Sequence, residues 1–137
     1  MPLHRIYHAV DAFSATDKKQ IAERITAIYT AVGLPGFYVN VLFVPLECLF
    51  VGGEARLNFV RIVTQHLAIH APPERKTATA KAIEEAMKPF VKDRGYDWEL
   101  HIEDTPREGW SMNGFAPPLV GEPGLKLWAE KNRPVPY

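Results

Sequence analysis

Pro2 is the first residue of this chain whose position suits it to chemistry. A proline in second position generally permits removal of the initiator methionine, which would leave the chain with a secondary amine at its start. An α-amino group ordinarily has a pKa of about 7.7–8.0, and burial or a nearby cation lowers that pKa further. Such a nitrogen could move a proton between carbon and oxygen, or add to a carbonyl group. The competing interpretation is that Pro2 merely follows the methionine.

Two arginines are candidates for binding an anion. Arg61 lies inside an apolar stretch, where a guanidinium needs an anionic partner. That partner could be a substrate carboxylate, or an acidic side chain of another subunit. Arg75 could bind a carboxylate, or be a solvated residue near the start of a helix.

Histidines recur at a spacing of four in two places, His66 with His70 and His4 with His8. On a helix, side chains four residues apart can share a zinc ion. On a strand they lie about 13 Å apart, which is too far for one ion. The β-branched residues between 59 and 71 favour a strand, although a helical pattern can also be drawn there. We therefore expect no metal site.

The composition indicates one globular domain spanning residues 1–137. Hydrophobic residues make up 47% and charged residues 23%, and 16 basic residues balance 16 acidic ones. This balance lacks the electrostatic signature of a nucleic-acid-binding or lipid-binding protein. No glycine-rich phosphate loop, Ser-His-Asp order or nucleotide fingerprint is present, so we expect no cofactor.

The cellular location follows from what the chain lacks. Its first residues have no long apolar core of a signal peptide, and its most apolar stretch, residues 39–51, is far too short for a membrane span. The single cysteine, Cys48, excludes an intrachain disulfide and a thiolate metal cage. We expect a soluble cytoplasmic protein without membrane association.

The first elements that must position these residues form a β-α-β unit over residues 3–53. Residues 3–9 are typical of a strand, Ser14 can cap a helix that Gly33 ends, and residues 37–44 indicate a buried strand. The apolar residues of the helix recur on one face: Ile21, Ile25, Ile28 and Val32.

A second β-α-β unit follows over residues 59–104. Its match to the first unit has a constant offset of 62 residues, which pairs Ile21 with Ile83, Ile25 with Met87, Ile28 with Phe90, Gly33 with Gly95, and His8-Ala9 with His70-Ala71. A strand over residues 97–102 closes the unit. Pro89 removes a helical hydrogen bond, so we expect the second helix to bend there.

Together these units predict an α/β fold in which one four-stranded sheet carries both helices on one face. The other face is too apolar to meet water, so we expect another subunit to cover it. Residues 105–137 form a proline-rich arm with a helical turn near 125–131. Its large aromatic side chains predict that it packs on its own subunit or on a neighbour: Trp110, Phe115, Trp128 and Tyr137.

The whole chain resembles the tautomerase superfamily, whose members carry a catalytic amino-terminal proline. It is most similar to the branch of cis-3-chloroacrylic acid dehalogenase and its oxalocrotonate tautomerase-like relatives. The stretches that carry this resemblance are Pro2-Leu-His-Arg-Ile-Tyr-His, Phe59-Val-Arg-Ile, Asp93-Arg-Gly-Tyr-Asp-Trp-Glu, Thr105-Pro-Arg-Glu-Gly-Trp and Asn132-Arg-Pro-Val-Pro-Tyr. The resemblance implies a tautomerase-like fold, a homotrimer with active sites at subunit boundaries, and cationic side chains that hold a carboxylate.

Several site residues follow from the resemblance, position by position. Pro2 matches the catalytic proline, while Tyr29 stands where the dehalogenase has a histidine. Tyr29 could act in catalysis, or be a core or pocket-wall tyrosine on the apolar helix face. Arg75 matches one of two substrate-binding arginines; the other falls near Pro72 and is missing, so Arg61 could replace it.

The water-activating residues of the dehalogenase are not retained. Its tyrosine falls at His101 and its glutamate at Met112 or Asn113, so no carboxylate is present to activate water. His101 could still donate a proton, or be a strand histidine bonded to backbone. Asn113 and Trp110 are expected to line the substrate pocket.

We therefore expect a tautomerase that acts on a small 2-oxo or 2-hydroxydienoate carboxylate, with Pro2 as its general base. Two alternatives remain open. One is a hydratase or dehalogenase of a 3-substituted acrylate. The other is a non-catalytic trimeric protein that binds small acids.

Overall fold

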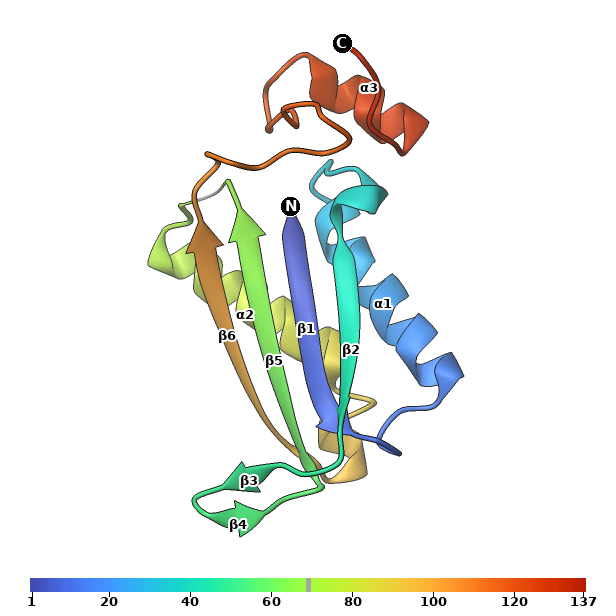
Figure 1. The fold of residues 1–137 in the computed structure, drawn as a ribbon, viewed down its shortest axis with the longest axis vertical. Helices are drawn as coiled ribbons and strands as arrows, with labels where there is room; N and C mark the ends of the chain where they lie inside the picture. The colour runs from blue at the N-terminus through green and yellow to red at the C-terminus, as the bar shows by residue number, and fades with distance from the viewer. Residues whose placement is uncertain (69) are drawn as a thin grey trace.

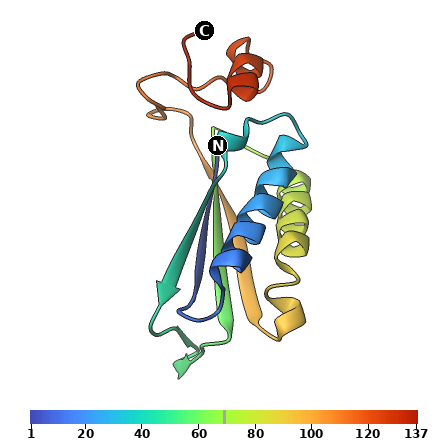
Figure 2. The ribbon, with the colours of Figure 1, turned by 90° about the vertical axis from the view of Figure 1, so that its right-hand side faces the viewer.

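The protein is described by a computed structural model that covers residues 1–68 and 70–137. Its body is a single four-stranded sheet with two long helices packed on one face (Figures 1 and 2). The four strands are β1 (Pro2–Ala9), β2 (Asn40–Leu46), β5 (Phe59–Leu67) and β6 (Asp97–Thr105).

The strand order, β2-β1-β5-β6, confirms two β-α-β units placed edge to edge. Each unit is a parallel pair, β1 with β2 and β5 with β6, whereas the central pair β1 and β5 is antiparallel. The start of β1 therefore meets the end of β5, and Pro2 is the cross-strand partner of His66.

Helix α1 (Ala15–Thr30) joins β1 to β2. Its cap is as expected: the Ser14 hydroxyl accepts from the Asp17 amide at 3.1 Å, and the Asp17 carboxylate accepts from the Ser14 amide at 3.0 Å. Gly33 has a φ of 85°, the left-handed conformation that ends the helix. The next strand begins at Asn40 rather than residue 37, because Gly36–Tyr38 forms the short helix η1.

Helix α2 (Pro73–Met87) differs from the expectation in one respect. The expected bend at Pro89 is wrong, because the helix already ends at Met87 and Pro89 lies in the turn that follows. That turn is closed by a hydrogen bond from the Phe90 amide to the Met87 carbonyl, which keeps Phe90 in the core. A short helix, η2 (Lys92–Arg94), then leads to Gly95, whose φ is 75°.

The sequence match between the two units is only partly structural. Gly33 and Gly95 both adopt left-handed conformations, and Ile21 and Ile83 are both fully buried. The strand ends do not correspond, since β1 ends at Ala9 but β5 ends at Leu67, before His70. The stretch 59–71 fits a strand or a helix by its residue pattern; residue 69 within it lies outside the described residues.

The helix-free face of the sheet has an apolar half and a polar half. Val41 and Phe43 pack into the core, so the alternate residue Leu42 lies on the open side, where it is 47% exposed. On β5 and β6 the register instead places charged and amide groups opposite each other. The expectation of an apolar face is therefore correct only for the β2 side.

Beyond the sheet lie a small hairpin at one end and the arm at the other (Figure 1). The hairpin consists of β3 (Phe50–Val51) and β4 (Glu54–Ala55), and the arm contains α3 (Gly124–Lys131). The arm has its own small core of Tyr38, Leu125 and Trp128, with the Trp128 indole donating to the Val135 carbonyl at 2.7 Å. The Tyr38 hydroxyl donates to the Pro118 carbonyl at 3.0 Å, so the arm packs on its own subunit, which is one of the two expected packings.

No helix within residues 1–68 and 70–137 is long and apolar enough to cross a membrane.

Candidate active site

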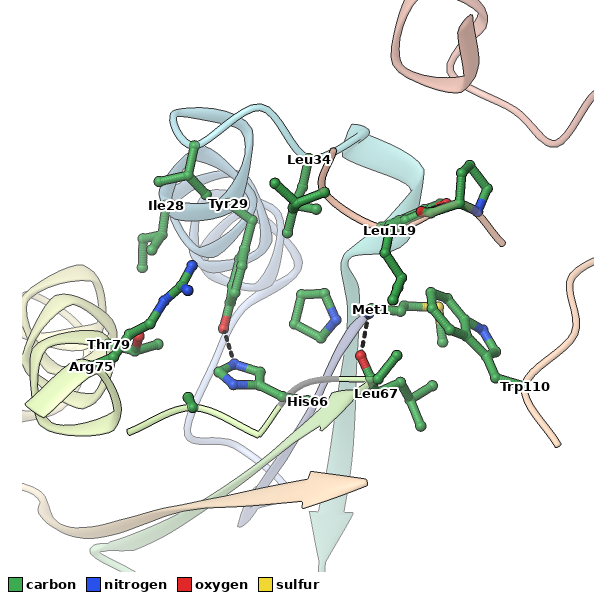
Figure 3. Close-up of a pocket in the computed structure, with 17 residues that line it drawn as sticks. Met1, Ile28, Tyr29, Leu34, His66, Leu67, Arg75, Thr79, Trp110 and Leu119 are labelled. Carbon is green, nitrogen blue, oxygen red and sulfur yellow. Dashed lines mark hydrogen bonds between the residues drawn. The ribbon is translucent and has the colours of Figure 1, made fainter. Parts of the chain in front are cut away.

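A cavity of about 380 Å³ opens at the end of the sheet where β1 begins (Figure 3). Its floor is the start of β1 and the end of β5, and its sides are the last turn of α1 and the first turns of α2. The arm forms the roof. Antiparallel pairing of β1 with β5 produces this arrangement, because it brings the carboxyl end of α1 and the amino end of α2 to the same place.

Pro2 is buried at the floor of this cavity. The residue ahead of it, Met1, forms two backbone hydrogen bonds with Leu67: its amine donates to the Leu67 carbonyl at 3.1 Å, and its carbonyl accepts from the Leu67 amide at 2.9 Å. Burial lowers the pKa of the Met1 amine to about 5. The Met1 amine is therefore expected to be neutral near pH 7.

Tyr29 comes from the last turn of α1, and its hydroxyl lies 3.0 Å from His66 Nε2 (Figure 3). Each of the two residues is 6% exposed. Burial raises the pKa of Tyr29 above its usual value and is the main cause that lowers the pKa of His66. Both groups are therefore uncharged near pH 7, and they line the cavity together.

Arg75 supplies positive charge from the first turn of α2, and its side chain extends toward the α1 side of the cavity (Figure 3). Among the described residues that line the cavity, it alone has a permanently charged side chain. The start of α2 is held by Asp104 of β6, which accepts from the Ala71 amide at 3.1 Å and from Lys76 Nζ at 2.7 Å.

The roof is mainly apolar and is fixed by polar contacts behind it. Trp110, Leu119 and Val120 face the cavity. Arg107 donates two hydrogen bonds to the Glu122 carboxylate, at 2.7 and 3.1 Å, and this carboxylate also accepts from the Leu119 amide at 2.8 Å.

Four of the residues expected at the site therefore meet at this cavity: Pro2, Tyr29, Arg75 and Trp110. The other three lie elsewhere in the chain. Arg61 donates to Glu99 Oε2 at 2.6 Å, and His101 Nε2 lies 3.0 Å from Glu103 Oε1. Asn113 lies in the turn between Met112 and Phe115, with a φ of 50°.

The strand period explains the positions of Arg61 and His101. Successive strand residues alternate between faces, and on β5 the helix-facing set includes the buried residues Val60, Ile62 and His66. Arg61 and its parallel partner Glu99 therefore lie on the helix-free face, as does His101. Arg61 therefore pairs with Glu99 of the same chain. The two expected partners were a substrate carboxylate and an acidic side chain of another subunit.

His66 is the cavity residue that sequence reasoning missed as a site component. Its spacing from His70 suggests a metal ligand and no other role. The available signal was its strand period: Pro2 and His66 would share a face if β1 and β5 were paired antiparallel in this register.

A protein-family model described as "Putative oxalocrotonate tautomerase enzyme" matches residues 1–133. No curated protein matches the chain.

Two solved structures are similar over nearly their whole length. Native RhCC from Rhodococcus jostii RHA1 is 43% identical with a TM-score of 0.92, covering 98% of this chain and 99% of its own. A probable enzyme from the thermophilic fungus Aspergillus fumigatus is 36% identical with a TM-score of 0.92, covering 100% and 98%. A third structure, N1 of the cis-3-chloroacrylic acid dehalogenase family, is 18% identical with a TM-score of 0.75, covering 94% and 96%, and therefore shows the fold alone.

Proposed function

This chain belongs to the oxalocrotonate tautomerase family, and from that premise we propose that it tautomerises a small 2-oxo or 2-hydroxydienoate carboxylate with Pro2 as general base. The observation that carries the proposal is the meeting of Pro2, Arg75 and the Tyr29–His66 pair at one cavity. The dehalogenase-like solved structure supports only the fold.

The proposed base acts through the nitrogen that removal of Met1 would expose. While Met1 is attached, this nitrogen is an amide without basicity. After removal it would be a secondary amine in the environment that lowers the pKa of the Met1 amine. A neutral amine could take the proton from the carbon beside the substrate carbonyl and return it to that carbon in the reverse reaction.

Arg75 would hold the substrate carboxylate. One guanidinium suits one carboxylate, and the remaining walls are largely apolar, with Leu34, Leu119 and Trp110 among them. We therefore propose a monocarboxylate with an apolar chain or ring as the preferred substrate. Phenylpyruvate should then have a higher kcat/KM than the dicarboxylate 2-hydroxymuconate.

The alternative reactions have less support. Hydration or dehalogenation of an acrylate needs a base for water, and no described residue that lines the cavity carries a carboxylate. A non-catalytic acid-binding protein would keep Met1 and bind carboxylates without turnover. Intact mass separates that case from the enzyme, because the enzyme must lack one methionine.

We also propose a homotrimer. The sheet has one face without helices (Figure 2), and its β2 side exposes Leu42. A solved neighbour with a TM-score of 0.66, the fused 4-OT F6, is described as an asymmetric trimer. Native mass spectrometry tests this assembly, and a monomer at micromolar concentration would contradict it.

Substitution Pro2→Ala tests the base. With Met1 removal verified by mass in both proteins, ketonisation of phenylpyruvate enol should fall at least about a hundredfold, the usual contribution of a positioned general base. Equal rates for the two proteins would reject the mechanism. Unchanged thermal unfolding would show that the loss does not arise from misfolding.

A further inference from the structure

Leu119 and Val120 line the cavity from the arm, and we call the segment that carries them, residues 116–122, the roof loop. Residues 117 and 118 are prolines without an N–H group, so their carbonyls are their only backbone hydrogen-bonding groups. The carbonyls of residues 116 to 119 each accept a hydrogen bond. The donors are, in that order, the Tyr137 hydroxyl at 3.0 Å, Arg107 Nη2 at 3.3 Å, the Tyr38 hydroxyl at 3.0 Å and the Glu122 amide at 2.9 Å.

Arg107 contacts the roof loop at two places. It donates to the Pro117 carbonyl near the beginning of the loop, and it donates to both oxygens of Glu122, at 2.7 and 3.1 Å, at the end of the loop. The same Glu122 carboxylate accepts from the Leu119 amide at 2.8 Å. A planar guanidinium has five N–H groups in a fixed arrangement, so one arginine can serve a carbonyl and a carboxylate together. Arg107 thereby connects both ends of the loop to each other.

The ion pair between Arg107 and Glu122 contributes little to the stability of the whole fold. The two side chains are 39% and 36% exposed, and water screens ion pairs with such exposure. The ion pair between Arg61 and Glu99 on the helix-free face is exposed to a similar extent, 42% and 50%, but holds no cavity segment. The effect of Arg107 is therefore local, on the position of the roof loop.

The roof loop lies across the cavity from the cation. Figure 3 shows Arg75 on one side of the Tyr29–His66 pair, and the roof residues Leu119 and Trp110 on the other side. An acid whose carboxylate is bound by Arg75 can therefore reach the roof only with its far end. An aryl group at that end would contact the apolar roof, whereas a short acid would not extend that far.

We propose that Arg107 is a positioning residue that fixes the roof loop where it contacts the far end of the substrate, and that it thereby sets the preference for aryl acids over short acids. This inference rests on the proposed function, in which Arg75 binds the substrate carboxylate. A loop that must become ordered when a ligand binds lowers the affinity, and a loop that is already ordered avoids this cost. Arg107 does not line the cavity, so it acts through Leu119 and Val120.

Binding of two unreactive acids to the full-length protein tests this role, with the state of the amino terminus verified by mass in every variant. Substitution Arg107→Met should raise the Kd of 3-phenylpropanoate about tenfold, because the roof side chains must then be ordered on binding. The Kd of propanoate should change less than twofold. Arg61→Met is the matched control and should leave both Kd values unchanged. NMR titration measures all of them, and an unchanged ratio of the two Kd values in Arg107→Met would overturn the proposal.

A double-mutant cycle tests whether Arg107 acts together with Glu122. Glu122→Gln removes the ion pair and should also raise the Kd of 3-phenylpropanoate, while the double variant should bind no more weakly than the weaker single variant. Losses that multiply would overturn the joint role. Arg107→Lys should recover only part of the affinity, because one ammonium group cannot reproduce the fork of contacts. Full affinity in Arg107→Lys would show that charge alone is needed, and would overturn the positioning role.

Amide hydrogen exchange gives a readout that needs no ligand. The Leu119 amide should exchange faster in Arg107→Met and in Glu122→Gln than in the wild-type protein, because its acceptor is then less firmly held. Exchange of the amides in β1 and β5 should stay at the wild-type rate in the same samples. Equal Leu119 exchange in Arg107→Met, Glu122→Gln and Arg61→Met would overturn the proposal, and Glu122→Gln keeps this test decisive if Arg107→Met does not fold.

Kinetics separate this inference from the proposed function. In Arg107→Met, KM for phenylpyruvate should rise about tenfold while kcat stays within twofold of wild type, because Arg107 does not take part in proton transfer. An unchanged KM in this variant, with activity lost in Pro2→Ala, would reject only the role of Arg107. Full activity in Pro2→Ala would reject the proposed function, and the binding of 3-phenylpropanoate would still decide the role of Arg107.

Discussion

Each end of the sheet buries a histidine on its helix-facing side, but only one of them lies beside a cavity. At the cavity end, defined by Pro2, Tyr29 and His66, the imidazole contacts a hydroxyl that faces open space. At the packed end, defined by His8, Phe13 and Phe43, the His8 ring lies 5.0 Å from the Phe13 ring and 6.1 Å from the Phe43 ring.

The difference shows that pairing two similar β-α-β units does not by itself decide which end of the sheet has a cavity. Antiparallel pairing of β1 and β5 creates two similar ends, each formed by the start of one central strand and the end of the other. Aromatic side chains fill the packed end. At the cavity end, the chain start and the arm leave a largely apolar space that Tyr29, His66 and Arg75 also line. We expect this division to hold in function: substitutions at the packed end should change stability, and substitutions at the cavity end should change the reaction.

Phe13→Ala should act on stability alone. Phe13 is 4% exposed at the packed end, so its truncation should lower the free energy of unfolding by about 3–5 kcal/mol. Urea unfolding measures this loss, while kcat of the folded fraction should stay within twofold of wild type. A drop in kcat without a drop in stability would show that the packed end serves the reaction.

Arg75→Ala should act on substrate binding alone. Loss of the guanidinium should raise KM for phenylpyruvate about a hundredfold, or roughly 2–3 kcal/mol, because a charge-assisted carboxylate contact disappears. Arg94→Ala is the matched control: Arg94 bonds both Asp17 oxygens, at 2.8 and 2.9 Å, near the packed end. It should cost at most about 1 kcal/mol of stability and leave KM unchanged. Equal KM values for the two variants would contradict the division.

His4, between the two ends, should make stability depend on pH. Burial, with a smaller effect of His66, lowers its pKa to about 3, against about 6.5 in an unfolded chain. The neutral ring therefore makes its full contribution to the free energy of unfolding above pH 6.5. That contribution falls by up to about 1.4 kcal/mol for each pH unit below 6.5. Urea unfolding at pH 7.0 and 5.5 should show a smaller loss for His4→Gln than for wild type. An equal loss would mean that His4 is protonated in the folded protein.

Much of the fold could be predicted from local signals. The cap at Ser14, the apolar helix face as far as Ile28 and the stop at Gly33 all depend on near neighbours, and each is observed. The expectation that Val32 belongs to that face is wrong: it lies beyond the end of α1 and is 62% exposed. Pro89 misled because a proline can end a helix as well as bend it, and only the packing of Phe90 shows which occurs.

The site was harder to predict because it depends on register. Arg61 and His101 are polar residues in apolar surroundings, a pattern that suggests function but does not say which face of the sheet they occupy. Their ion-pair partners, Glu99 and Glu103, follow from strand pairing and period. His66 was missed as a site residue for the same reason: its relation to Pro2 depends on pairing between strands far apart in sequence.

The separate hydrophobic cluster of the arm has a consequence for how specificity could diversify. The floor of the cavity belongs to the sheet and the roof to a segment that packs around Trp128. Relatives could therefore exchange roof residues such as Leu119 and Val120 to admit a longer or more polar substrate, while the proton-transfer groups below retain their geometry. Chimaeras that swap only the arm would be the natural way to redirect this scaffold toward new acids.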